Sequence, residues 1–168
     1  MKKILVSLIF CLCCSFTMFA QNREPSKATR PFTVKPKQSV ADLGRSLRGE
    51  NKVEDLIGGE GMQLRVAIQH DEKKDTALAE LHDASDDVYY VLEGSAQLTL
   101  GGKLDNPKEQ SVGEWRSDKI VGGTTFTIKK GDLIIVPRGT PHHRINTKGK
   151  TFSLILIKIF QDPLPAKK

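Results

Sequence analysis

Histidine and carboxylate side chains occupy positions from which they can reach one point in space. Glu80, His82 and Asp87 lie close together in the sequence, and His142 lies far downstream. If residues 76–82 form a strand, Glu80 and His82 share a face, because side chains two apart along a strand point the same way. Two imidazoles with one or two carboxylates form a workable ligand set for one divalent ion, manganese, iron or zinc. A polar ligand site without metal and a pair of structural histidines remain alternative interpretations.

The segment around His142 has the pattern of a strand, a tight turn and a second strand. Residues 133–136 are apolar, Pro137 ends the run because proline has no N–H for a β-ladder, and Gly139 allows a sharp reversal. The spacing resembles the second signature motif of the cupin family at each of its defining positions, which are Gly131, Pro137, Gly139, His142 and Asn146.

Residues 80–94 resemble the first cupin motif in part. The spacing and the Tyr-Val-Leu-Glu-Gly ending are kept, but Glu80 stands where a histidine is expected and Asp87 where a glutamate is expected. The resemblance covers residues 62–160 and implies an all-β, antiparallel jelly-roll β-barrel of the cupin type. It also implies metal-ligand positions for His82, Asp87 and His142.

The roles of the two carboxylates remain open at this level. Glu80 is long enough to replace an imidazole as a ligand, and it is equally suited to act as a catalytic base or to contact the substrate. Asp87 is one methylene shorter than the usual glutamate, so its carboxylate can fall short of the ion.

Two further residues share the faces of the predicted ligands and are candidates for binding substrate. Tyr89 follows Asp87 by two positions, and Arg144 follows His142 by two. Tyr89 is interpreted as a hydrogen-bond donor in the site or as a packing aromatic. Arg144 is suited to bind a substrate carboxylate or to form a salt bridge at the end of a strand.

Other polar and aromatic residues are expected outside the site. His70 is predicted to face solvent and His143 to point outward from its strand, whereas Tyr90 is predicted to pack. Trp115 is the single tryptophan and lies in residues 101–123, a polar stretch that is interpreted as a long loop. In that loop it either anchors the chain or stacks on a ligand.

The remaining pattern predicts many short strands separated by turns. Residues 62–69 alternate between apolar and polar side chains, and turn signals such as Glu93–Gly94 separate most of the later segments. A helical spacing from Ser39 to Gly49 predicts one short helix. The predicted strands after the first span residues 76–82, 87–92, 95–100, 124–129, 132–136, 142–147 and 152–160.

The first twenty residues have the layout of a secretory signal peptide. Lys2 and Lys3 precede an apolar run that ends at Ala20, too short to favour a membrane-spanning helix. We therefore predict an exported, periplasmic or extracellular protein with no stable membrane insertion after cleavage. All three cysteines lie in this leader, so the mature chain is predicted to lack disulfides and thiolate ligands.

The rest of the chain is predicted to form one domain with polar ends. Residues 21–37 are an extended N-terminal segment, 38–61 a short helical lead-in, 62–160 the cupin barrel and 161–168 a tail. Loss of Lys2 and Lys3 lowers the count of Lys and Arg from 26 to 24 against 20 acidic residues, a net charge of +4. These basic residues are scattered, so binding of nucleic acid is not expected.

Three hypotheses about function follow. The leading one is a barrel that binds a small polar or acidic molecule at a mononuclear divalent metal, with isomerase, lyase or dioxygenase chemistry implied by the resemblance. The second is a non-enzymatic ligand-binding module with weak or no metal binding. The third is a homodimer that uses the apolar run Phe152–Phe160 as an exposed edge.

Overall fold

The computed structural model describes residues 24–165. The predicted leader, with its cleavage site and cysteines, lies outside the described residues. Residues 24–34 form a unit apart from the rest of the chain and contain no helix or strand. Within the described part, no helix is long and apolar enough to cross a membrane.

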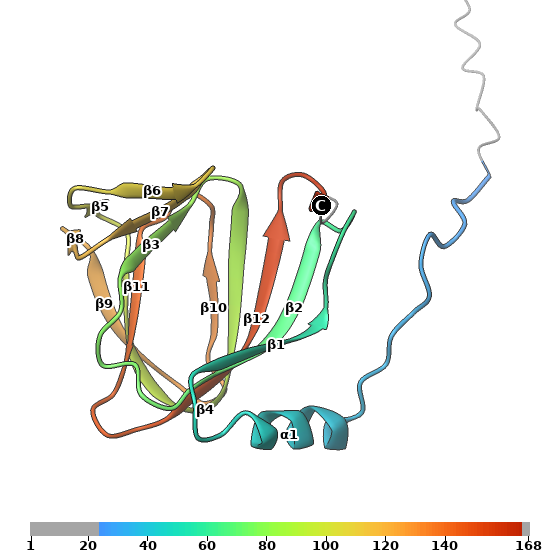
Figure 1. Cartoon of the computed structure of the whole chain (residues 1–168), viewed down its shortest axis with the longest axis horizontal. Helices are drawn as coiled ribbons and strands as arrows, with labels where there is room; N and C mark the ends of the chain where they lie inside the picture. Colours follow the sequence, from blue (N-terminus) through green and yellow to red (C-terminus); the bar gives the residue numbers. More distant parts are fainter. Residues whose placement is uncertain (1–23, 166–168) are drawn as a thin grey trace, which may run out of the picture. The chain divides into compact units, whose positions relative to one another are not determined.

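The second unit contains one short helix followed by strands (Figure 1). The elements are α1 (Lys37–Ser46), β1 (Lys52–Ile57), β2 (Leu64–Asp71), β3 (Ala79–His82), β4 (Ser85–Leu100), β5 (Lys103–Leu104), β6 (Lys108–Ser111), β7 (Glu114–Ser117), β8 (Ile120–Val121), β9 (Thr124–Lys129), β10 (Leu133–Val136), β11 (His142–Asn146) and β12 (Phe152–Phe160).

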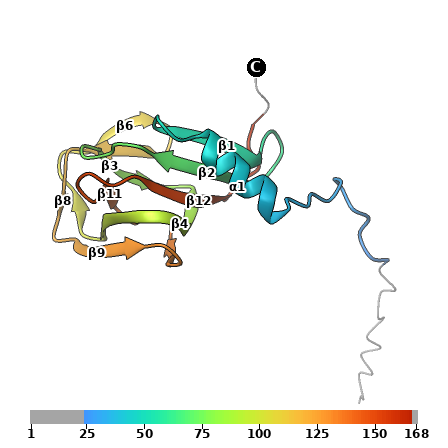
Figure 2. The same cartoon turned by 90° about the horizontal axis from the view of Figure 1, so that it is seen from below.

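All strand pairs in this unit are antiparallel, and β4 takes part in both walls of a barrel. Its first part pairs with β12 and β10, and its second part pairs with β11 and β9. One wall continues from β12 to β2 and β1, and the other from β11 to β3, β7 and β6 (Figures 1 and 2). The predicted all-β antiparallel barrel with one short helix is confirmed.

Gly94 is the point at which β4 passes from one wall to the other. Its φ of 79° lies in the left-handed region that favours glycine. A Cβ built there would lie 2.0 Å from the carbonyl oxygen of Thr151, so a side chain would collide with backbone. The signal at Glu93–Gly94, interpreted as a turn between two strands, is therefore a bend within one continuous strand.

The apolar core lies between the walls around this bend. Its members are inward-facing residues of β4, β9, β10 and β12, among them Val91, Leu98, Phe152 and Leu154, all of which are fully buried. The alternation of buried and more exposed residues along β4 follows the two-residue period of a strand with one buried face. The core thus fixes which side chains of β4 point into the barrel.

The stretch 101–123 is more ordered than a loop. Strand β7 pairs with β3 on one side and β6 on the other, and β5 pairs with β8. Trp115 of β7 donates a hydrogen bond from Nε1 to Asp83 Oδ2 at 2.7 Å, which agrees with an anchoring role. Sequence patterning missed these strands because they are short and mostly polar.

The lead-in and the last strand also differ from expectation. The helix ends at Ser46, and residues 52–57 form β1, which extends the sheet beside β2. Strand β12 is not an edge, because it pairs with β2 on one side and with β4 on the other. The hypothesis that Phe152–Phe160 is an exposed dimer edge is therefore wrong.

The bend at Gly94 predicts a specific sensitivity of the fold. Gly94→Ala is expected to lower the free energy of unfolding by the left-handed penalty of about 1–2 kcal/mol and by a further ~1–3 kcal/mol from overpacking. Gly101→Ala is the matched control, because Gly101 has a similar φ of 75° but nothing within 4 Å of the added Cβ. Urea denaturation of both variants checks this, and equal losses would contradict it.

Candidate metal centre

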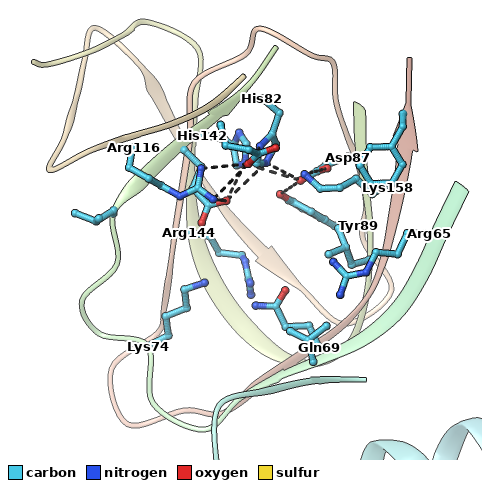
Figure 3. A pocket seen from close by; sticks show the side chains of 16 residues that line it. Arg65, Gln69, Lys74, His82, Asp87, Tyr89, Arg116, His142, Arg144 and Lys158 are labelled. Atoms are coloured by element: carbon cyan, nitrogen blue, oxygen red, sulfur yellow. Dashed lines mark hydrogen bonds and ion pairs between the residues drawn. The ribbon is translucent and has the colours of Figure 1, made fainter. Parts of the chain in front are cut away.

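Strand register brings the candidate residues together on one inner wall. In β3 and β11, Glu80 lies directly opposite His142, and across β3 and β7 His82 lies opposite Glu114. Directly opposed residues of antiparallel strands point to the same face. The rings of His82 and His142 consequently meet inside the barrel with centroids 5.0 Å apart, as Figure 3 shows.

Each imidazole is oriented by a hydrogen bond at Nδ1. His82 Nδ1 donates to Glu114 Oε2 at 2.7 Å, and His142 Nδ1 donates to the carbonyl oxygen of Thr140 at 3.0 Å. Burial lowers the pKa of His142, which favours its neutral ring. Both Nε2 atoms are buried and form no hydrogen bond, so each presents a lone pair to the interior. Such an outer partner at the second ring nitrogen is typical of metal-binding histidines.

The donor atoms are spaced as a single ion would require. One ligand atom each from Glu80, His82 and His142 lies within 4.8 Å of the others. Glu80 Oε2 is 3.7 Å from His82 Nε2 and 3.9 Å from His142 Nε2. Ligands bound at about 2.0–2.2 Å lie no more than about 4.4 Å apart, and both Glu80–histidine separations meet this limit.

Asp87 lies beside this group but is shared with other partners. Its Oδ2 is 3.4 Å from His82 Nε2 and accepts a hydrogen bond from Tyr89 at 3.0 Å, while Oδ1 is 3.2 Å from Lys158 Nζ. Burial acts to raise the pKa of Asp87, but its charged neighbours, among them the Lys158 ammonium, outweigh burial and lower the value to about 2. Asp87 is therefore a buried, ionised carboxylate whose Oδ2 lies 3.4 and 3.9 Å from the Nε2 atoms of His82 and His142, and its role as a metal ligand stays a prediction.

The donor group opens into a cavity of about 500 Å³. Its walls carry more cationic than acidic side chains (Figure 3). The cationic residues that line it are Arg65, Lys74, Arg116, Arg144 and Lys158, and the acidic ones are Glu80, Asp87 and Glu114. A small anionic molecule that enters this cavity would meet both the imidazoles and several positive charges.

Comparison with known proteins supports the fold. No family model and no curated protein matches the chain. Among solved structures, the protein BH2720 of Bacillus halodurans is 20% identical, with a TM-score of 0.54 over 83% of this chain and 88% of that one.

Two further solved structures align with lower TM-scores. A double-stranded β-helix protein from Klebsiella pneumoniae is 17% identical, with a TM-score of 0.48 over 88% of this chain and 99% of that one. The cupin domain of Cnp3 from Schizosaccharomyces pombe is 16% identical, with a TM-score of 0.48 over 65% and 64%. The antiparallel barrel of this chain places the segments of both motifs at one interior site. This is a cupin fold. At these identities the likeness concerns the fold alone.

The cupin barrel holds Arg144 in a buried ion pair. Arg144 Nη1 lies 2.7 Å from Asp71 Oδ2, and the guanidinium lies over the Phe152 ring at 4.8 Å from its centroid. The salt bridge expected as one of two possibilities is thus present, although Arg144 also lines the cavity. Tyr89 is buried and hydrogen-bonded to Asp87, so it packs in the core and also donates within the site.

Of the three residues predicted to lie outside the site, His70 and Tyr90 differ from expectation. The prediction for His70 is wrong, because the residue is 1% exposed and hydrogen-bonded to Ser153 Oγ and Glu72 Oε2. Tyr90 was expected to pack but is 43% exposed on the outer face. His143 lies off the cavity wall and its Nε2 hydrogen-bonds the carbonyl oxygen of Ala77.

Several cavity residues were not found from the sequence. Glu114 and Arg116 belong to β7, which was interpreted as part of a loop, and Lys74 lies in the connection between β2 and β3. Lys158 interrupts the apolar run of β12, and a charge at an inward position of a central strand was the available signal.

The buried ion pair predicts a large effect of one small substitution. Asp71→Asn leaves the Arg144 guanidinium buried without its counter-charge, and we expect a loss of about 3 kcal/mol in the free energy of unfolding. Asp55→Asn is the control, because the Asp55–Arg65 pair is 53% and 31% exposed at its two side chains. Loss of such a surface pair should cost only ~0–1 kcal/mol. Similar losses in the two variants, measured by chemical denaturation, would contradict the prediction.

Proposed function

We propose that this cupin-fold domain binds one divalent metal ion through Glu80, His82 and His142, and holds a small acidic molecule beside it. The observation that carries the proposal is the pair of buried, unbonded Nε2 atoms that face a carboxylate at 3.7 and 3.9 Å. Lone pairs and carboxylate oxygens repel one another at such distances, and a cation at their centre would reverse the interaction.

The resident side chains divide into holding and orienting roles. Glu80 takes the position of an imidazole in the ligand set, and Glu114 and the Thr140 carbonyl hold the two rings. Asp87 stays charged next to His82 and is anchored by Lys158 and Tyr89. A bound divalent ion would supply a Lewis acid that polarises an oxygen of the ligand. We propose isomerase or lyase chemistry on this basis, whereas dioxygenase-type chemistry, which needs O2 and a redox-active ion, rests on the resemblance to cupins alone.

Tyr89 is the group suited to donate a hydrogen bond near the reacting centre. Burial raises the pKa of Tyr89 well above its usual value, so the hydroxyl remains protonated at neutral pH. It lines the cavity and donates to Asp87 Oδ2. This arrangement keeps a neutral donor beside an ionised carboxylate on the cavity wall.

Metal content is the direct test. Protein purified without an affinity tag should contain about one manganese, iron or zinc ion per chain by elemental analysis, and His82→Ala should lose most of it because two donors bind far more weakly than three. His143→Ala is the matched control, since His143 lies off the cavity wall, and it should retain the metal.

A second function is favoured by the altered ligand set. Replacement of a histidine by Glu80 and of a glutamate by Asp87 is compatible with a non-enzymatic module of weak metal affinity. Metal-free wild-type protein that still binds small acids would support this second function and contradict the first.

We also propose that the protein is exported. The basic start and apolar run of residues 2–20 support it. When the full chain is produced in a bacterium, the mature protein should be recovered outside the cytoplasm with an N-terminus near Gln21, as measured by intact mass. A full-length cytoplasmic product would contradict this proposal.

A further inference from the structure

A second polar group lies in the same cavity, on the other side from the imidazoles. Figure 3 shows the side chains of Lys74, Arg144 and Gln69 pointing toward one another below His142 and His82. They come from the β2–β3 connection, from β11 and from β2, so three separate segments of the chain build this end of the cavity.

Lys74 forms no close ion pair with any carboxylate among the described residues. Its ammonium group forms no hydrogen bond or ion pair within residues 24–165, although its side chain is partly buried in the cavity wall. Its backbone is held in place, because its carbonyl oxygen accepts a hydrogen bond from the Asn146 amide at 2.7 Å. Burial is the largest cause that lowers the pKa of Lys74, and the positive charge of Arg144 adds to it, while the carboxylates of Asp71 and Glu80 act in the opposite direction.

Arg144 presents nitrogen atoms to the same space. One edge of its guanidinium faces Asp71 at 2.7 Å, and its other nitrogens form no hydrogen bond with the described residues. Gln69 donates from Nε2 to Asp71 Oδ1 at 3.0 Å, so Asp71 is held from two sides. The position of Arg144 is therefore set by a buried carboxylate and by the Phe152 ring beneath it.

Charge balance indicates how many negative charges the ligand should bring. The five cationic residues that line the cavity are equal in number to the carboxylates around them, which are the three on its wall together with Asp55 and Asp71. The divalent ion of the proposed function would leave two positive charges in excess. A dianion would restore neutrality, and desolvated charges without partners are costly.

We propose that the cavity binds a small dicarboxylate, with one carboxylate between Lys74 and Arg144 and the other at the Glu80, His82 and His142 group. The second contact rests on the proposed function, whereas the first rests on Lys74 and Arg144 alone. A volume of about 500 Å³ accommodates such an acid with a short carbon chain.

The test compares dicarboxylates with their monoamides. Calorimetric titration of the purified chain with succinate, glutarate and adipate should detect binding of at least one acid. Its monoamide, which keeps the shape but loses one charge, should bind the wild type about 10-fold or more weakly, because a charge-assisted hydrogen bond is lost. In Lys74→Met this preference should fall to nearly 1, with metal content and melting temperature unchanged.

Two further variants test whether the loss of preference comes from the charge of Lys74 itself. Lys73→Met removes a neighbouring charge that lies outside the cavity wall and should keep the wild-type preference. Lys74→Arg should restore most of the preference that Lys74→Met loses.

The outcomes separate this inference from the proposed function. An unchanged preference in Lys74→Met, or no binding of any of the three acids to the wild type, would overturn the inference even if the metal is present. Metal-free wild-type protein that still shows the Lys74-dependent preference would overturn the metal assignment but support the carboxylate contact.

Discussion

The passage of β4 from one wall of the barrel to the other is the constraint on which the site depends. The strand pairs with β12 and β10 before Gly94 and with β11 and β9 after it. Because the strand is continuous, the inward face that carries Asp87 and Tyr89 is tied to the register of β11. Strand β11 in turn aligns His142 with Glu80 of β3. A single backbone path thus relates residues from distant parts of the sequence.

Charge compensation organises the interior that this barrel encloses. Each cation of the cavity wall except Lys74 forms an ion pair with a carboxylate of the described residues, as in the Asp71–Arg144 and Asp87–Lys158 pairs. Paired charges of this kind make a polar cavity compatible with a folded core, since an unpaired buried charge is costly. The two Nε2 atoms and the Lys74 ammonium are among the groups without a hydrogen-bond partner in the described residues, and the proposed ligands would satisfy them.

Strands with apolar runs and clear turn residues were predicted from the sequence, whereas short polar strands were not. Strands β9, β10, β11 and β12 were anticipated within one or two residues because apolar runs and turn residues bound them. Strands β6 and β7 were missed because they are short and polar, and because they are stabilised by pairing of β7 with β3 and of β6 with β7. The prediction for His70 was wrong because its acidic neighbours suggested solvent, whereas the side chain is buried and hydrogen-bonded to Ser153 of β12.

The sequence by itself determined the all-β class and the residues that can do chemistry, because a two-residue period and the spacing of glycine, proline and histidine are local properties. Only the tertiary structure decided which of those residues meet. Glu80 joins the two imidazoles through the β3–β11 register, and Lys74 joins Arg144 through the β2–β3 connection. The spacing of residues along the sequence predicts neither of these contacts, because each depends on segments that are far apart in the chain and meet only in the folded barrel.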